Sequence, residues 1–232
     1  MKEPSLEQTF KQTVFREVSS VMAALAEPAR LELLELLCQR ERGVEELASL
    51  VGSRVNTVSH HLQILADRKL ARRRKVGRSV QYEASRMGLQ LWSEVSRITS
   101  AELSDIKVAI RELAESTDAA EELDHKELLA RMSRNEVVLV DVRPREEFEA
   151  GHVPGAISMP METLREQIDS LPTGREVVAY CRGRYCVLSY EAVRELRSRG
   201  YNAVRSADGV AEWRSSERTI SQEGNHEDTV HT

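Results

Sequence analysis

The sequence has few cysteines and no long apolar run. Its 232 residues include three cysteines, which is too few for a disulfide framework in a chain of this length. We therefore expect reduced thiols that are available for chemistry, as in the cytoplasm. The longest apolar runs, such as Val137–Val140, are far too short to cross a bilayer, and the polar N-terminus lacks the apolar core of a signal peptide. The expected protein is cytoplasmic and has no membrane partner.

Charge is distributed unevenly along the chain. Residues 1–85 contain 14 Lys and Arg against 11 Asp and Glu, whereas residues 86–232 contain 19 against 27. The first part is therefore net positive by three and the second net negative by eight. A polyanion such as DNA is attracted only by the first part. The length allows two small domains, and the acidic part is expected to do something other than bind DNA.

The most basic stretch, residues 54–78, contains a helix with two different faces. Eight of these residues are basic and only Asp67 is acidic. Val55, Val58, Leu62 and Leu65 recur at the spacing of one helix face, which is expected to be buried. The other face carries mostly short polar side chains, which can reach base edges and phosphates.

A basic wing is predicted to follow this helix. Leu70–Glu83 has the pattern of two short strands around Val76-Gly77-Arg78. A solvated charged face is the alternative, but this density of one sign of charge favours DNA binding. We expect base or phosphate contacts, with double-stranded operator DNA as the partner, from Ser53, Arg54, Asn56, Thr57, Ser59, His60, Arg72, Arg73, Arg74 and Arg78.

Three predicted helices precede the reading helix. They cover Leu6–Ala26, Ala29–Gln39 and Val44–Val51, and Ser53 is placed to cap the reading helix. Three helices, a tight turn, a reading helix and a wing make an α+β winged helix-turn-helix domain.

Residues 15–85 closely resemble the ArsR family of winged-helix repressors. The resemblance is carried by ALAEPARLELLELL and by VEELASLVGSRVNTVSHHLQILADRKLARRRKVGRSVQYEAS, of which VSHHLQIL is the most specific part. It implies a homodimer that binds a palindromic operator and releases it when an inducer arrives. The third helix reads GVEEL and lacks the Cys-x-Cys type of motif of the family's metal sensors, so no metal is expected there.

Residues 86–116 are predicted to form one long amphipathic helix. Its apolar stripe needs a partner, and the expected partner is the first helix together with its copy in a second subunit. Residues 116–123 read as a short acidic linker.

From Asp124 onward, short apolar runs alternate with helical patterns. This alternation predicts an α/β domain with a mostly parallel sheet, in which active loops follow the carboxyl ends of strands. The strand candidates are Val137–Val142, Ala156–Met159, Val177–Cys181 and Ala203–Arg205, and the helix candidates are Lys126–Met132, Met161–Ser170 and Cys186–Gly200.

Cys181 ends one of these strands and is the candidate nucleophile. A short basic turn with Arg182 and Arg184 follows it, and a helix is predicted to start near Cys186. Backbone N–H groups, a positive helix end and two guanidinium groups each lower a thiol pKa. The alternative is a buried structural cysteine, but the coincidence of strand, basic turn and helix favours a reactive thiol.

Residues 124–215 closely resemble a rhodanese domain, the sulfurtransferase fold that carries sulfur as a cysteine persulfide. The matching pieces are DVRPREEFEAGHVPGAISMP, CRGRYC and DGVAEW. The resemblance implies that Cys181 is the persulfide-carrying nucleophile and that Asp141 and Arg143 order its loop. It also implies a small sulfur donor: thiosulfate, a polysulfide or a persulfide.

The loop departs from the rhodanese pattern at its last residue. Many rhodaneses read Cys-x4-Arg, whereas this chain has Cys186 there, which argues against high thiosulfate turnover and makes Cys186 a candidate resolving thiol. Phosphatases and arsenate reductases of related fold read Cys-x5-Arg. Residue 187 is Val, which argues against phosphoryl or arsenate chemistry.

These patterns predict four segments. Residues 1–115 are expected to form the DNA-binding and dimerisation domain, 116–123 a linker, 124–220 the rhodanese-like domain, and 221–232 a polar, disordered tail. The leading hypothesis is a dimeric repressor that responds to sulfane sulfur, with no cofactor or metal. The alternatives are a sulfurtransferase that autoregulates its operon, and a redox or metalloid sensor that uses Cys181 and Cys186.

Overall fold

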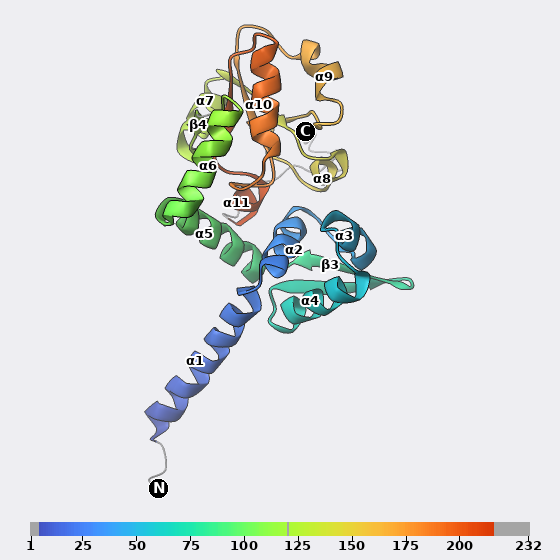
Figure 1. Ribbon diagram of the computed structural model, residues 1–232, viewed down its shortest axis with the longest axis vertical. Helices are drawn as coiled ribbons and strands as arrows, with labels where there is room; N and C mark the ends of the chain where they lie inside the picture. The colour runs from blue at the N-terminus through green and yellow to red at the C-terminus, as the bar shows by residue number, and fades with distance from the viewer. Residues whose placement is uncertain (1–4, 120, 216–232) are drawn as a thin grey trace, which may run out of the picture. The chain divides into compact units, whose positions relative to one another are not determined.

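A computed structural model describes residues 5–119 and 121–215 (Figure 1). Contacts within the chain divide it into two compact units, residues 1–89 and 90–232. The predicted tail at 221–232 lies outside the described residues. None of the helices within the described ranges is long and apolar enough to cross a membrane.

The first unit is the predicted winged helix-turn-helix. Its antiparallel sheet has the order β1-β3-β2, and its core is formed by leucines of α2 and α4, together with Leu47 and Leu70. The elements are α1 (Leu6–Leu25), α2 (Pro28–Gln39), β1 (Arg42–Gly43), α3 (Val44–Leu50), α4 (Val55–Asp67), β2 (Ala71–Val76) and β3 (Ser79–Ala84).

The second unit contains a five-stranded parallel sheet with the order β4-β8-β7-β5-β6. Its strands are β4 (Glu122–Leu123), β5 (Val137–Asp141), β6 (Ile157–Ser158), β7 (Glu176–Tyr180) and β8 (Ala203–Ser206). Its helices are α6 (Ser104–Ser116), α7 (His125–Ser133), α8 (Arg145–Ala150), α9 (Leu164–Gln167), the 3-10 helix η1 (Ile168–Ser170), α10 (Leu188–Ser198) and α11 (Val210–Ser215).

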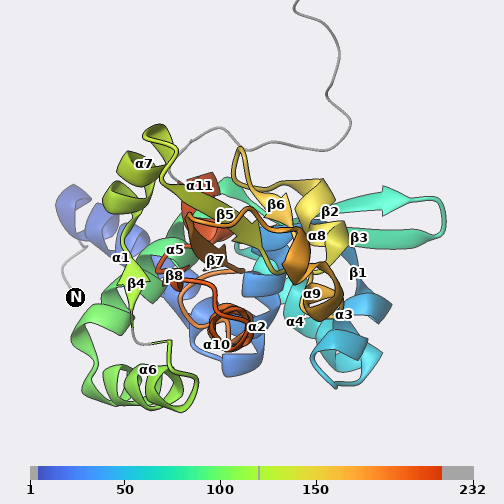
Figure 2. The same ribbon diagram turned by 90° about the horizontal axis from the view of Figure 1, so that it is seen from above.

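Both faces of this sheet are covered, as expected for parallel strands. Figure 2 shows α6, α9 and α10 on one face and α7 and α11 on the other. Two separate apolar clusters match these faces. One contains Ala114 and Leu196 and the other contains Leu128 and Trp213. Cys181 follows the carboxyl end of β7, which is the central strand of this sheet.

The prediction of one long helix over 86–116 was wrong. α5 (Arg86–Glu102) and α6 are separated at Leu103, whose backbone is extended (φ −85°, ψ 119°). From Gln90 onward these helices belong to the second unit, because Trp92 and Ser96 of α5 and Ala114 of α6 are buried there. The segment read as a linker contains β4, which pairs with β8 at the edge of the sheet.

Candidate functional site

The reading helix, α4, presents most of the expected side chains to solvent. Val58, Leu62 and Leu65 are buried, so the apolar face is oriented as predicted. Of the side chains expected to contact DNA on this helix and just before it, only Ser59 is half-buried, and it accepts a hydrogen bond from Gln63 Nε2 at 3.4 Å. The exposed ones are Ser53, Arg54, Asn56, Thr57 and His60.

Two details at the start of α4 were predicted wrongly. The N-cap residue is Arg54, without a side-chain cap, so Ser53 does not cap the helix. Ser53 instead donates its backbone N–H to Ala48 O at 2.9 Å and so closes the turn. Val55 is 46% exposed, because it lies on the first turn, beyond the edge of the core.

The wing divides its arginines into two kinds. Arg72 is 3.1 Å from Glu83, and Arg74 binds both carboxylate oxygens of Glu41, which raises the Arg74 pKa. Arg73 and Arg78 are exposed and form no ion pair with any residue that the structure describes. Of these four arginines, only Arg73 and Arg78 therefore have no carboxylate partner among the described residues.

The loop from Cys181 to Cys186, named the reactive loop after the prediction for Cys181, connects β7 with α10. The Cys181 Sγ is buried, 3.4 Å from Ser189 Oγ, 3.4 Å from the carbonyl oxygen of Cys186 and 3.8 Å from that of Gly183. The loop thus wraps around the sulfur, and the first turn of α10 closes the site. The helix begins at Leu188, two residues later than predicted.

The surroundings of Cys181 stabilise its thiolate. Burial raises the thiol pKa, but hydrogen bonds from the Cys186 and Ser189 side chains and from the Ser189 and Gly183 backbone outweigh it. The resulting pKa is about 6. The same hydrogen bond to Cys181 raises the pKa of Cys186, so Cys186 remains the protonated partner of the pair. Both cysteines are free.

The two loop arginines are not among the largest causes of this low pKa, contrary to expectation. Arg182 binds the buried carboxylate of Glu147 at 2.7 Å, and Arg184 binds Asp208 at 2.5 Å. Hydrogen bonds from Cys186, Ser189 and Gly183 lower the Cys181 pKa more than either guanidinium does. They fix the outside of the loop to neighbouring segments instead.

Asp141 and Arg143 lie at the end of β5, next to Tyr180 at the end of β7. Both are fully buried, and Arg143 donates to the Asp141 carboxylate at 2.6 and 2.9 Å and to Gly151 O at 2.9 Å. Tyr180, the residue before Cys181, accepts a hydrogen bond from Val153 N–H at 3.1 Å and interacts with Asp141. The pair is thus placed to order the strand end from which Cys181 extends.

The sequence did not reveal two residues of this region. Glu212 is buried beside the loop, accepts from Gly209 N–H at 2.9 Å, and has its pKa raised by burial to about 8. Gly209 packs so closely that a Cβ there would lie 2.4 Å from Cys181 O. DGVAEW marks this segment, but no local pattern shows that its carboxyl group is buried.

Tyr185, inside the loop, is the other residue that was missed. Its hydroxyl donates to Ser96 O at 3.0 Å and lies 2.6 Å from Thr99 Oγ1, both on α5. Its ring meets Trp92 edge-on with a centroid distance of 6.2 Å. The residues in contact are more than 80 positions apart in the chain, so no sequence pattern indicates the contact.

In the part of the chain that the structure describes, no group of three or more His, Cys, Asp or Glu could hold a metal ion.

Comparison with known proteins matches both units. The family described as "Bacterial regulatory protein, arsR family" matches residues 27–72, and "Rhodanese-like domain" matches residues 124–216. The HTH-type transcriptional regulator Rv0324 of Mycobacterium tuberculosis is 40% identical over 205 residues, which cover 88% of this chain and 90% of that protein. These matches confirm both resemblances.

Two other relatives each match one part. A sulfurtransferase of Allochromatium vinosum is 34% identical over 94 residues, 40% of this chain and 86% of that protein. A transcriptional repressor SmtB homolog of Synechocystis is 35% identical over 82 residues, 35% of this chain and 62% of that protein. Of these three relatives, only the regulator Rv0324 aligns with most of both units. The chain therefore belongs to the arsR family of bacterial regulatory proteins and carries a rhodanese-like domain after its winged helix-turn-helix.

Proposed function

We propose that this regulator is a homodimeric, operator-binding repressor in the cytoplasm and that a persulfide on Cys181 signals sulfane sulfur to it. The observation that carries the proposal is a stabilised thiolate, with a pKa of about 6, in a loop that contacts α5 through Tyr185. α5 starts at Arg86, directly after the wing. α5 therefore runs from the end of the wing to the residues that Tyr185 of the reactive loop contacts.

Operator binding is supported by the surface of α4 and the wing. Asn56, Thr57 and His60 are exposed on the first turns of α4, where short side chains reach base edges. Arg73 and Arg78 have no carboxylate partner among the described residues, so they can bind phosphates without first breaking an ion pair.

Dimerisation is supported by the apolar side chains of α1. Leu6, Phe10, Val14 and Val18 recur every four residues along one side of α1 and are 88%, 66%, 38% and 51% exposed. A soluble helix rarely leaves such a stripe in water, and a second copy of the chain would cover it. A two-fold dimer also matches a palindromic operator.

The sulfur step is a simple exchange. The Cys181 thiolate attacks the outer sulfur of a donor persulfide, R–S–SH. A new S–S bond forms, the donor S–S bond breaks, and its electron pair leaves on R–S⁻, so that Cys181 carries –S–SH and no oxidant is needed. Once Cys181 no longer holds the negative charge that helps to raise the Cys186 pKa, Cys186 can pass its proton to R–S⁻ and attack Cys181 Sγ, which releases HS⁻ and forms a disulfide.

The loop has little room for the added sulfur. Sγ already has three neighbouring atoms at 3.4 to 3.8 Å. An extra sulfur atom must therefore shift loop atoms, and Tyr185 moves with them relative to Ser96 and Thr99. We infer that this movement changes α5 and, through it, operator affinity.

A second candidate function is sulfur transfer with turnover. The relative named sulfurtransferase matches 40% of this chain, within the rhodanese-like part. An enzyme would pass sulfur rapidly to a thiol or cyanide acceptor, whereas a sensor would remain modified. Slow acceptor-dependent release, together with loss of operator binding, favours the sensor.

The test is operator binding before and after polysulfide treatment, using an operator selected from random DNA by the protein itself. Wild type is expected to gain about 32 Da per added sulfur at Cys181 at first, to lose two hydrogens once Cys186 resolves the persulfide to a disulfide, and to release the operator. Cys181→Ser should neither gain sulfur nor release the operator. Cys186→Ser should accumulate the persulfide, because nothing resolves it.

Tyr185→Phe tests the connection to α5. This variant keeps the ring but loses both hydroxyl contacts, so it should form the persulfide normally and release the operator less completely. Tyr201→Phe is the matched control, since its hydroxyl donates to Ile168 O at 2.9 Å, away from α5. If wild-type protein carries the persulfide and still binds its operator unchanged, the sensor proposal is refuted and the enzyme is favoured.

A further inference from the structure

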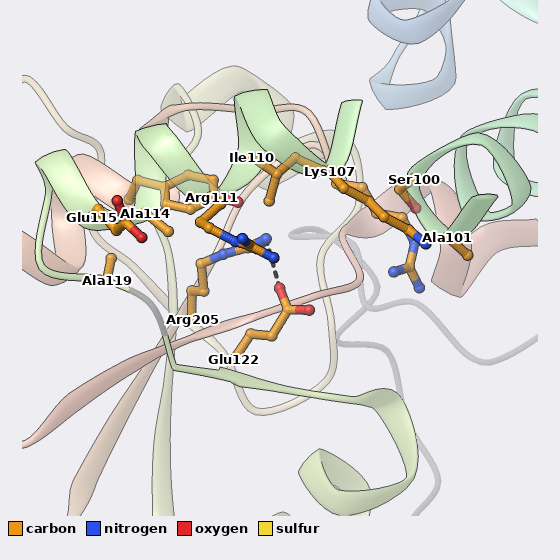
Figure 3. A pocket seen from close by; sticks show the side chains of 12 residues that line it. Ser100, Ala101, Lys107, Ile110, Arg111, Ala114, Glu115, Ala119, Glu122 and Arg205 are labelled. Atoms are coloured by element: carbon orange, nitrogen blue, oxygen red, sulfur yellow. Dashed lines mark ion pairs between the residues drawn. The ribbon is translucent and has the colours of Figure 1, made fainter. Parts of the chain in front are cut away.

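The second unit contains a cavity that neither the DNA-reading surface nor the cysteine chemistry uses. Its volume is about 630 Å³, and it lies among the end of α5, α6, α10, β4 and β8 (Figure 3). Pockets of 300–1,000 Å³ are the usual size for small organic ligands. The charged side chains that line it are Lys107, Arg111, Glu115, Glu122, Arg184 and Arg205.

The lining is positive although the surrounding unit is acidic. Four cationic side chains face two carboxylates, whereas residues 86–232 as a whole are net negative by eight. A concave surface of one sign of charge focuses the field and concentrates oppositely charged ligands. An isolated positive cavity in an acidic domain therefore favours a small anion over a polyanion, which the rest of the unit repels.

The four cationic side chains differ in whether they already bind a carboxylate. Arg205 binds Glu122 at 2.7 Å, drawn as the dashed line in Figure 3, and stacks over the Tyr190 ring at 4.1 Å. Lys107 and Arg111 are exposed and form no ion pair with a described residue. They are four positions apart on α6, which places them on the same helix face.

Arg184 connects this cavity with the reactive loop. Its Nη2 binds Asp208, but its Nε is buried and has no hydrogen-bond partner among the described residues. The Tyr190 hydroxyl, also in the lining, is likewise buried without a partner there. Buried donors are normally satisfied, so these two groups leave hydrogen-bonding capacity at the border of the cavity.

We propose that this cavity binds a small organic molecule with two or more anionic groups, held mainly by Lys107, Arg111 and Arg184. Ile110, Ala114 and the Tyr190 ring supply apolar contact for its carbon part. The volume is much larger than a bare sulfate needs, which favours an organic di- or trianion over an inorganic one.

The bound anion is an effector of the same reactive loop, and this second step rests on the proposed function. Arg184 lies three residues after Cys181, and Tyr190 follows Ser189, whose hydroxyl is 3.4 Å from the Cys181 sulfur. An anion that attracts the Arg184 guanidinium competes with Asp208 for it and shifts the loop. Occupancy of the cavity therefore changes the rate at which Cys181 reacts.

The test measures anion binding to the reduced full-length protein by calorimetry at constant ionic strength. Citrate and pyrophosphate are the probes, because they distinguish carboxylate from phosphate as the preferred anionic group. Lys107→Ala/Arg111→Ala should weaken binding of the preferred probe by roughly tenfold or more, since it removes two charge-assisted contacts. Lys126→Ala/Arg194→Ala is the control, because it removes the same charge from exposed residues outside the lining.

Equal affinity in the two double variants, or no binding of either probe to wild type, overturns the proposed site. The effector step has its own measurement, the rate of Cys181 alkylation by iodoacetamide with and without the bound probe. A change of at least about twofold in wild type that disappears in Lys107→Ala/Arg111→Ala supports it. An unchanged rate refutes the effector step, whereas persulfide formation and operator release remain separate tests of the sensor.

Discussion

Replacement of Cys186 by Ala should raise the pKa of Cys181. The Cys186 side chain provides the largest of the hydrogen bonds that lower this pKa to about 6. A hydrogen bond to a charged group contributes about 1.5–3 kcal/mol, and one pKa unit corresponds to about 1.4 kcal/mol. Because a thiol is a weak donor, we expect the lower end of this range, a rise of about one unit.

The measurement is the rate of Cys181 alkylation by iodoacetamide between about pH 4 and pH 9, followed by mass spectrometry of the peptide. The thiolate is the reactive form, so the rate rises with pH and its midpoint reports the pKa. At pH 7 a thiol with this pKa is about 90% ionised, whereas an ordinary cysteine is roughly 3% ionised. The wild-type midpoint should be near 6, and that of Cys186→Ala near 7.

Two controls separate this effect from general damage to the fold. Ser189→Ala removes another hydrogen bond to the same sulfur and should shift the midpoint in the same direction but less. Cys38→Ala, in the core of the first unit, should leave it unchanged. A midpoint of Cys186→Ala equal to that of wild type would refute the stabilisation of the thiolate by Cys186.

Three further outcomes are expected. Arg73→Ala/Arg78→Ala should lower the dependence of operator affinity on salt concentration by ~0.9 in the log–log slope per lost phosphate contact. Arg72→Ala/Arg74→Ala should lower this slope by less, because those two arginines already bind carboxylates. Equal slopes for the two double variants would contradict this difference between the arginines. Insertion of about 5 bp between operator half-sites should abolish tight binding by a rigid dimer, as measured by gel shift, and tolerance would exclude such a dimer. The Glu212 carboxyl should stay protonated in the folded state up to about pH 8, whereas the unfolded state releases that proton at the usual carboxyl pKa. Between these two pH values, the free energy of urea unfolding of wild type should therefore fall relative to that of Glu212→Gln by roughly 1.4 kcal/mol per pH unit. Parallel plots of unfolding free energy against pH for the two proteins would show that Glu212 is charged when folded.

The sequence predicted what depends on local pattern. Periodicity located α4 and its buried face, and the change from helices to alternating short strands located the α/β domain. Cys181 was predicted to be the nucleophile because a strand end, a glycine-containing turn and a helix start adjoin in the sequence, and the structure places it after β7 and ahead of α10. Errors of one or two residues occurred at helix starts, where Arg54 rather than Ser53 is the N-cap.

The rest depends on contacts between distant residues. The charges of Arg182 and Arg184 were visible in the sequence, but their carboxylate partners, Glu147 and Asp208, are 35 and 24 residues away. Without those partners, the arginines were expected to act on Cys181. The packing of Tyr185 against α5 and the burial of Glu212 are equally non-local, because they depend on how α5 and α11 pack on the sheet.

The buried ion pair Asp141–Arg143, beside the strand end that precedes Cys181, restricts how the sequence of the second unit can change. Removing one member of a buried pair such as Asp141–Arg143 costs about 3–5 kcal/mol, out of a total stability of about 5–15 kcal/mol. During evolution, this ion pair can therefore change only when both of its residues are substituted together. The exposed residues of α4 and the wing can change singly at little cost in stability. Descendants of such a protein can thus acquire new operators quickly while the cysteine chemistry stays the same.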